Sequence, residues 1–154
     1  MMWPTLFAAG NLLALACWAL LIFGPRNDLV RSAVVYCGAG LLCLAYTAGL
    51  GLLLTGLVDG GSLPGAGEAG FTSIAGVRAL FLSDGGATLG WLHYLALDLF
   101  TGMWIARDAD AKQFARMWQA PVLALTFVAG PVGLLLWLVL REPAARRPRS
   151  KVNR

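Results

Sequence analysis

The amino-acid sequence predicts an all-α integral membrane protein built as a four-helix bundle. Of its 154 residues, 58% are hydrophobic and only 13% are charged, against roughly 45–50% and about 25% in soluble domains. This composition excludes a disordered chain, which needs low hydrophobicity and high net charge. It also leaves too few polar residues to cover a water-soluble globule. The apolar residues fall in four runs, each near the roughly 20 residues that cross a membrane.

Each predicted span has boundaries that the sequence marks. The spans lie at about residues 5–24, 29–58, 87–106 and 121–140. Pro25 stops the first helix, and Asn27 with Asp28 caps the next. At about 1.5 Å per residue the second span is longer than the hydrocarbon layer is thick, so we expect it to tilt or to protrude. Pro121 opens the fourth span, where a proline is tolerated.

A polar, glycine-rich connection at 59–86 joins the second and third spans. Within it, residues 71–82 are apolar but too few to cross, which predicts a short interfacial or re-entrant helix. Residues 1–140 therefore form a single membrane domain. The three cysteines lie in apolar stretches, and with a single histidine in the chain they predict free thiols and no metal site.

The last segment, 141–154, is a basic tail that holds six of the 12 lysines and arginines. Basic residues next to a membrane span typically contact lipid headgroups and mark the cytoplasmic side. We therefore expect membrane lipid, and no nucleic acid, as the partner of this tail, and a cytoplasmic C-terminus. Four spans would then place the N-terminus on the same side. The basic residues in the turn after the third span would lie on the opposite side, which weakens this orientation.

The third span has two distinct faces when its residues are placed at about 100° per position. One face carries the polar and aromatic side chains, namely Trp91, His93, Tyr94, Asp98, Thr101, Gly102 and Trp104. The other carries Leu92, Leu95, Ala96, Leu99, Met103 and Ala106. We expect the second face to contact lipid and the first to face the interior of the bundle.

Asp98 lies near the middle of this span, where a carboxylate costs on the order of 2.5–3.5 kcal/mol. It is either a packing device that hydrogen-bonds Asn11 or Thr126, or an acid, base or polar anchor in a ligand pocket. His93, the only histidine, lies about 140° from Asp98 around the helix. It is either a structural residue or a second group bordering the same cavity. A single histidine excludes haem held by two histidines of one chain.

The aromatic residues on or beside the polar face are Trp91, Tyr94, Phe100 and Trp104. Their clustering suits a flat apolar pocket for a hydrophobic ligand, although ordinary aromatic packing explains it equally well. In the fourth span, Pro131 deprives the Phe127 carbonyl of its helical partner. A kink is predicted there, which either shapes a ligand site or bends the helix around its neighbours.

Two adjacent strings carry a family resemblance: residues 90–102, GWLHYLALDLFTG, and residues 104–108, WIARD. They resemble the signature of the abscisic-acid-deficient-four-like family, small membrane proteins related to the plant factor required for neoxanthin synthesis. Further agreements follow in order, at Asn11, Trp18, Pro25, Pro121 and residues 130–134, GPVGL. The resemblance covers most of the chain but not the 59–86 connection.

This resemblance implies an isomerase that converts violaxanthin, an epoxy-carotenoid, to the allenic neoxanthin. That reaction is redox-neutral and implies no cofactor. One group protonates the epoxide oxygen and another removes a proton from the adjacent polyene carbon, in a pocket poor in water. The resemblance makes Asp98 the acid and His93 the base, or the reverse. The expected substrate-binding residues are Trp91, Tyr94, Thr101, Trp104, Asn11 and Pro131.

Other functions fit the same residues. A non-catalytic protein that binds carotenoid or lipid would use the same aromatic pocket, whereas a small transporter would need a longer polar route. A structural assembly factor would need only the helix faces rich in small residues. The first span begins within a few residues of Met1, without an arginine- and serine-rich leader, which indicates a prokaryotic inner membrane. A homodimer that completes the pocket is also compatible with so thin a bundle.

Overall fold

The computed structural model describes residues 2–61 and 68–145, and all regular secondary structure in these ranges is helical. The elements in chain order are α1 (Met2–Phe23), α2 (Asp28–Ser32), the π-helix η1 (Ala33–Gly40), α3 (Leu41–Leu54), α4 (Ile74–Phe81), α5 (Asp84–Ala111), α6 (Arg116–Val128) and α7 (Gly130–Ala145). The all-α class predicted from the sequence is therefore confirmed. The short helix expected within 71–82 is present as α4.

Two helical segments of the described chain are long and apolar enough to cross a membrane. They are Met2–Phe23 and the 27 residues of Asp28–Leu54, in which α2, η1 and α3 follow one another without a break. Both coincide with spans predicted from the sequence. The helix α5 is 28 residues long, but Asp98 and its charged ends make it less apolar.

Local side-chain and glycine chemistry sets the helix ends. The Asn27 side chain accepts a hydrogen bond from the Val30 amide at 2.8 Å, so it caps α2 as predicted. Ser83 caps α5 in the same way, through the Gly86 amide at 2.9 Å. The second span ends at Leu54, four residues earlier than predicted. Gly56 adopts a φ of +69°, and the amide next along the chain, that of Leu57, bonds back to Leu52, which closes the helix.

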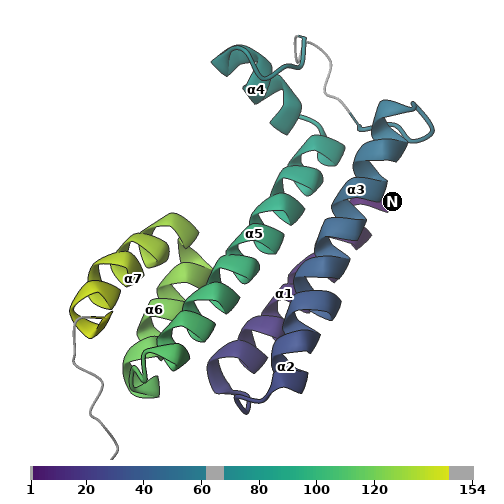
Figure 1. Ribbon diagram of the computed structural model, residues 1–154. Coiled ribbons are helices and arrows are strands. Elements are labelled where there is room, and N and C mark those ends of the chain that lie inside the picture. Colours follow the sequence, from purple (N-terminus) through teal and green to yellow (C-terminus); the bar gives the residue numbers. More distant parts are fainter. Residues whose placement is uncertain (1, 62–67, 146–154) are drawn as a thin grey trace, which may run out of the picture.

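The long helices lie side by side with α5 at the centre (Figure 1). Glycines bring their backbones close together. A Cβ added at Gly38 of η1 would stand 2.7 Å from the Cys17 sulfur of α1 and 3.0 Å from Leu99 of α5. A Cβ at Gly49 of α3 would stand 2.8 Å from Leu89. Small residues at these positions therefore serve close helix packing.

The orientation predicted for α5 is wrong. Residues assigned to lipid form the centre of the core, with Leu92 and Leu99 fully buried. The polar and aromatic face is the more open one, and Trp91 and Tyr94 keep 42% and 56% of their surface exposed. Apolarity alone does not distinguish a helix-packing face from a lipid-facing one, because lipid tails are as apolar as leucine. The leucine and alanine face packs closely against the other helices and is therefore interior.

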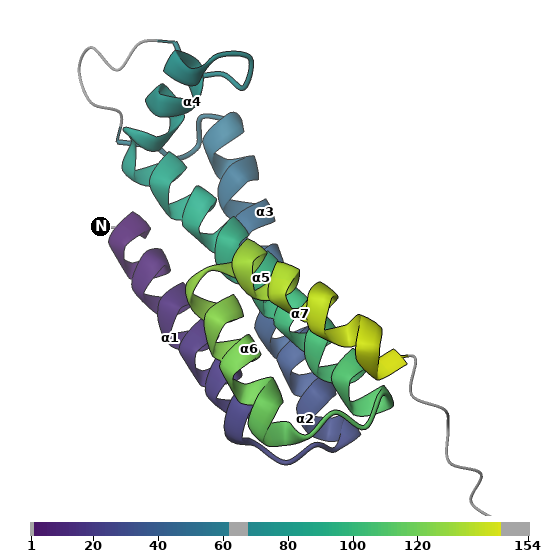
Figure 2. The same cartoon turned by 90° about the vertical axis from the view of Figure 1, so that its left-hand side faces the viewer.

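The fourth predicted span, 121–140 with a kink at Pro131, is instead divided between two separate helices, α6 and α7. The chain leaves the helical conformation at Ala129, with φ −149° and ψ 78°, and α7 turns back along α6 (Figure 2). The second half of α7 lies beside the end of α5, where the Trp137 indole donates a hydrogen bond to Asp108 at 3.0 Å and Arg141 pairs with the same carboxylate. The pair α6–α7 is therefore a helical hairpin whose tip reaches only the middle of α5. As a result, the N-terminus of α1 and the C-terminal end of α7 lie at opposite ends of the bundle (Figure 2).

Candidate functional site

A cavity of about 420 Å³ lies between α1, α5 and the tip of the α6–α7 hairpin. Its lining is mostly apolar and aromatic, and comprises Asn11, Ala14, Leu15, Trp18, Trp91, Tyr94, Leu95, Asp98, Phe127, Val128, Ala129, Gly130 and Pro131. The rim side chains Leu15, Tyr94 and Val128 are all more than half exposed. The cavity therefore opens sideways from the bundle, and a hydrophobic molecule can reach it from that side.

Asp98 brings the only acidic side chain to this cavity among the described residues. It projects from the middle of α5, is half-buried, and has no hydrogen-bond or ion-pair partner within 2–61 and 68–145. The packing role considered from the sequence required Asn11 or Thr126 as a partner. The Thr126 hydroxyl instead donates to the Val122 carbonyl at 2.8 Å. Asp98 is thus a free polar group in an apolar site, where a ligand atom can reach it.

The break between α6 and α7 lies directly against the Asp98 carboxylate. A Cβ added at Gly130 would collide with the Asp98 side chain, so glycine is required where the two meet. Pro131, the second residue of α7, has no backbone donor. The Val132 and Gly133 amides both donate to the Ala129 carbonyl, at 2.9 and 3.1 Å. In a membrane, non-helical backbone is tolerated only where protein buries it or where it lines a cavity. Here it lines the cavity.

Trp91 forms one wall of the cavity and is fixed from α1. Its indole nitrogen donates to the Asn11 side-chain oxygen at 3.0 Å, and its ring stacks on Phe7 at 6.0 Å between centroids. On another wall, Trp18 contacts Phe127 with ring centroids 5.6 Å apart. Held rings of this kind give a preformed apolar surface, and Asp98 is the polar group within it.

The structure does not bring all the predicted site residues together. Asp98, Trp91, Tyr94, Asn11 and Pro131 line the cavity, whereas the remaining predicted residues, His93, Thr101 and Trp104, do not line it. Of the two alternatives for His93, the lining of the cavity therefore does not support a group that borders the same cavity as Asp98. His93 faces α3, where its ring lies 5.6 Å from that of Tyr46.

Trp104 contacts the hairpin and not the cavity, because the Arg141 guanidinium of α7 lies 5.3 Å from the centre of its ring. The sequence reasoning also missed residues that do belong to the site. Gly130 was noted only within the GPVGL string of the family resemblance, and Phe127 only for its carbonyl. Trp18 had a signal in the family resemblance, whereas Leu95 was assigned to lipid.

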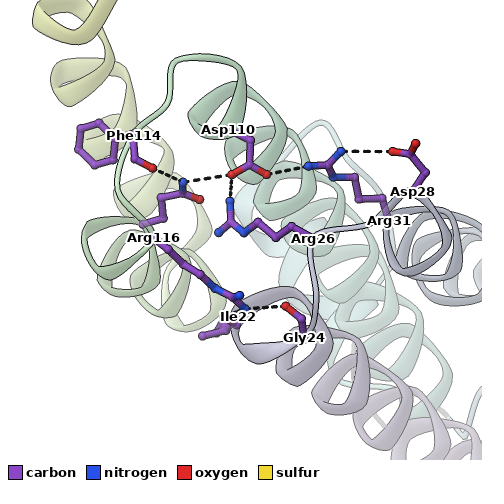
Figure 3. A network of polar contacts seen from close by, with 9 residues as sticks. Ile22, Gly24, Arg26, Asp28, Arg31, Asp110, Phe114 and Arg116 are labelled. Atoms are coloured by element: carbon purple, nitrogen blue, oxygen red, sulfur yellow. Dashed lines mark hydrogen bonds and ion pairs between the residues drawn. The ribbon is translucent and has the colours of Figure 1, made fainter.

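A network of charged residues lies at the end of the bundle where α1 connects to α2 (Figure 3). Asp110 of α5 pairs with Arg26 and with Arg31, the latter at 2.8 Å, and also accepts from Gln119 at 3.3 Å. Arg116 of α6 donates to the carbonyls of Ile22 and Gly24 at the end of α1, at 3.0 and 2.6 Å. The network therefore ties the α1–α2 connection to the hairpin.

Asp108, two residues before Asp110 on α5, holds α7 in place. It accepts hydrogen bonds from Lys112 at 2.6 Å and from Trp137, and pairs with Arg141 at 3.0 Å. Burial alone would raise the pKa of Asp108. The hydrogen bonds from Lys112 and Trp137 and the charges of Lys112 and Arg141 outweigh that effect and hold the pKa below its usual value. The hairpin is thus held by an ionised carboxylate outside the predicted span.

Comparison with known proteins identifies the family of this chain. No curated protein and no solved structure matches the chain. The sequence profile of the family described as ABA DEFICIENT 4-like matches residues 5–137, which include every residue that lines the cavity. The chain belongs to the ABA DEFICIENT 4-like family.

Proposed function

We propose that this protein binds one end of a carotenoid or a similar polyisoprenoid in the cavity and isomerises it, using Asp98. The observation that carries the proposal is the unpartnered Asp98 carboxylate in an apolar cavity that opens sideways. Family membership supports a relation to neoxanthin synthesis. A cavity of about 420 Å³ lies within the usual range for small-ligand sites. It suits the ring end of such a molecule, with the polyene chain extending outward.

The isomerisation of an epoxide to an allene requires one proton to be given and one to be taken. Because His93 lies outside the cavity, we assign both transfers to Asp98. In its protonated form, Asp98 gives its proton to the epoxide oxygen as a carbon–oxygen bond breaks. Its second oxygen takes the proton from the adjacent polyene carbon, whose electron pair completes the allene. The product keeps every atom of the substrate, and Asp98 returns to its protonated form.

A membrane location follows from the same proposal. Helix α1, the segment Asp28–Leu54 and α5 would cross the bilayer, while the α6–α7 hairpin would enter and leave on one side. Broken helices that meet in the middle of a membrane commonly form substrate sites. The side opening would then face lipid, in which a carotenoid is dissolved.

The experiment compares pigments extracted from a violaxanthin-producing host that expresses the wild-type protein or a variant. The wild type should yield an allenic product. Asp98→Asn removes the acid while keeping size and shape, and should lower product formation by about 10²–10⁴-fold. Asp84→Asn, an exposed carboxylate outside the cavity, is the matched control and should retain activity.

His93→Gln separates the two assignments of the base, since it should retain activity if Asp98 makes both transfers. Loss of product in His93→Gln, with normal folding, would return the base role to His93. A product formed equally by Asp98→Asn would reject catalysis by Asp98. Pigment that co-purifies unchanged with every variant would instead identify a non-catalytic carotenoid-binding protein.

A further inference from the structure

A second cavity, of about 250 Å³, lies at the charged end of the bundle, between the start of the Asp28–Leu54 segment and α5. It shares no lining residue with the cavity at Asp98. We propose that it binds the phosphate oxyanion of an anionic lipid headgroup. This proposal rests on the membrane location proposed above, but not on the chemistry of Asp98.

Two guanidinium groups supply the positive charge. Arg107 of α5 is exposed and has no hydrogen-bond or ion-pair partner in the part of the chain that the structure describes. Arg31 is held in place by Asp110 at 2.8 Å, and it also pairs with Asp28 at 3.3 Å. Asp28 lines the cavity too, but its side chain is 97% exposed, so water screens its charge. Arg107 is therefore the group free to pair with a phosphate oxygen.

The rest of the lining combines polar and apolar side chains. Ser32 and Tyr36 contribute hydroxyl groups, while Val35 and Met103 are apolar. A lipid likewise combines a charged phosphate and a polar glycerol region with an apolar acyl chain. Basic pockets between membrane helices on the cytoplasmic side are known to take such headgroups.

The helix that lines this cavity is itself unusual. The π-helix η1 begins at Ala33 and includes both Val35 and Tyr36. π-Helical turns are rare and occur frequently at functional sites. The widened turn therefore lies at the cavity wall, where hydroxyl, apolar and cationic side chains meet.

Lipid binding to the purified full-length protein in detergent tests this proposal, with native mass spectrometry counting bound lipids. Phosphatidylglycerol should bind more tightly than zwitterionic phosphatidylcholine. Arg107→Gln should weaken phosphatidylglycerol binding by about fivefold, the value of one cation near a membrane surface. Arg78→Gln makes the same charge change at the exposed surface of α4, at the other end of the molecule, and should bind like the wild type.

Equal losses in Arg107→Gln and Arg78→Gln, or no loss in Arg107→Gln, would overturn the site. A further arm adds inorganic phosphate alone. Inorganic phosphate could saturate an Arg107-dependent site while phosphatidylglycerol shows no additional binding there. In that case the lipid assignment is wrong and the ligand is free phosphate. Asp98→Asn should bind phosphatidylglycerol normally, so failure of the catalytic proposal and failure of this one give different results.

Discussion

At the scale of single residues, the contact between Asp98 and Gly130 organises the site. The carboxylate comes from α5 and the glycine from the first position of α7, and they meet where no side chain fits between them. Asp98 needs this opening because the opposite side of α5 is filled by the core side chains Leu92 and Leu99. Gly130 therefore sets the position of the carboxylate as well as the space beside it.

Replacing Gly130 with alanine should displace Asp98 and lower both stability and product formation. Filling a packed position typically costs about 1–3 kcal/mol. Gly51→Ala is the matched control, because a Cβ there meets nothing within 4 Å, and helix propensity should stabilise that variant by up to about 1 kcal/mol. Thermal unfolding in detergent and pigment analysis measure the two effects. Identical behaviour of the two variants would show that Asp98 does not depend on Gly130.

Much of the site could be predicted from single residues, and the failures have a common cause. A carboxylate in the middle of an apolar run is costly, so Asp98 was identifiable without a structure. His93 was misplaced because its angle around the helix was known but the neighbours of each face were not. Tyr46 faces His93, and the hairpin tip faces Asp98. Only the arrangement of the other helices decides which face of α5 borders the cavity.

At the scale of helices, the α6–α7 hairpin is the element that the sequence did not reveal. Pro131 predicts a disturbed helix, but a missing donor is compatible with a kink as well as with a reversal. Long-range contacts decide between them. Trp137 is fully buried, lies edge-on to Phe114 with ring centroids 5.4 Å apart, and bonds to Asp108. These contacts form only when α7 folds back.

The contacts of Asp108 with Lys112, Trp137 and Arg141, here called the Asp108 clamp, predict how the stability of the hairpin depends on pH. Because the folded-state pKa is lowered, the clamp stabilises the fold above the ordinary aspartate pKa of about 3.9. That stabilisation is lost as the pH falls through the lower, folded-state value. Between about pH 5 and about pH 3, the midpoint of thermal unfolding should therefore fall more steeply for the wild type than for Asp108→Asn.

The control for this measurement is Asp28→Asn, whose side chain is 97% exposed. Its acid profile should follow that of the wild type. Parallel profiles for the wild type and Asp108→Asn would mean that the clamp contributes no acid-sensitive stability.

At the scale of the whole molecule, the reversal of α7 removes a conflict in the charge pattern. With four crossings, the basic tail and the basic turn after the third span would lie on opposite sides. In the structure, Arg107, Lys112 and Arg116 lie at the same end as Arg141, after which the tail begins. Six of the 12 lysines and arginines lie at this end, five follow beyond residue 145, and Arg78 lies at the other end.

We therefore expect the charged end to be cytoplasmic, with the two termini on opposite sides of the membrane. Reporter fusions to each terminus test this, using one reporter active only in the cytoplasm and another active only outside it. The C-terminal fusion should report the cytoplasm and the N-terminal fusion the opposite side. Two cytoplasmic termini would restore the four crossings predicted from the sequence and contradict the hairpin.

The sideways opening of the cavity limits which differences between ligands the protein can recognise. A cavity of about 420 Å³ would enclose only one end of the proposed polyene ligand and would leave the remainder outside the wall formed by Trp91, Asn11 and Pro131. Recognition is then local, and two molecules that share one end group but differ at the far end should be handled alike. A substrate with two identical ends would have to leave, turn round and bind again before its second end could react, so products modified at one end should accumulate first.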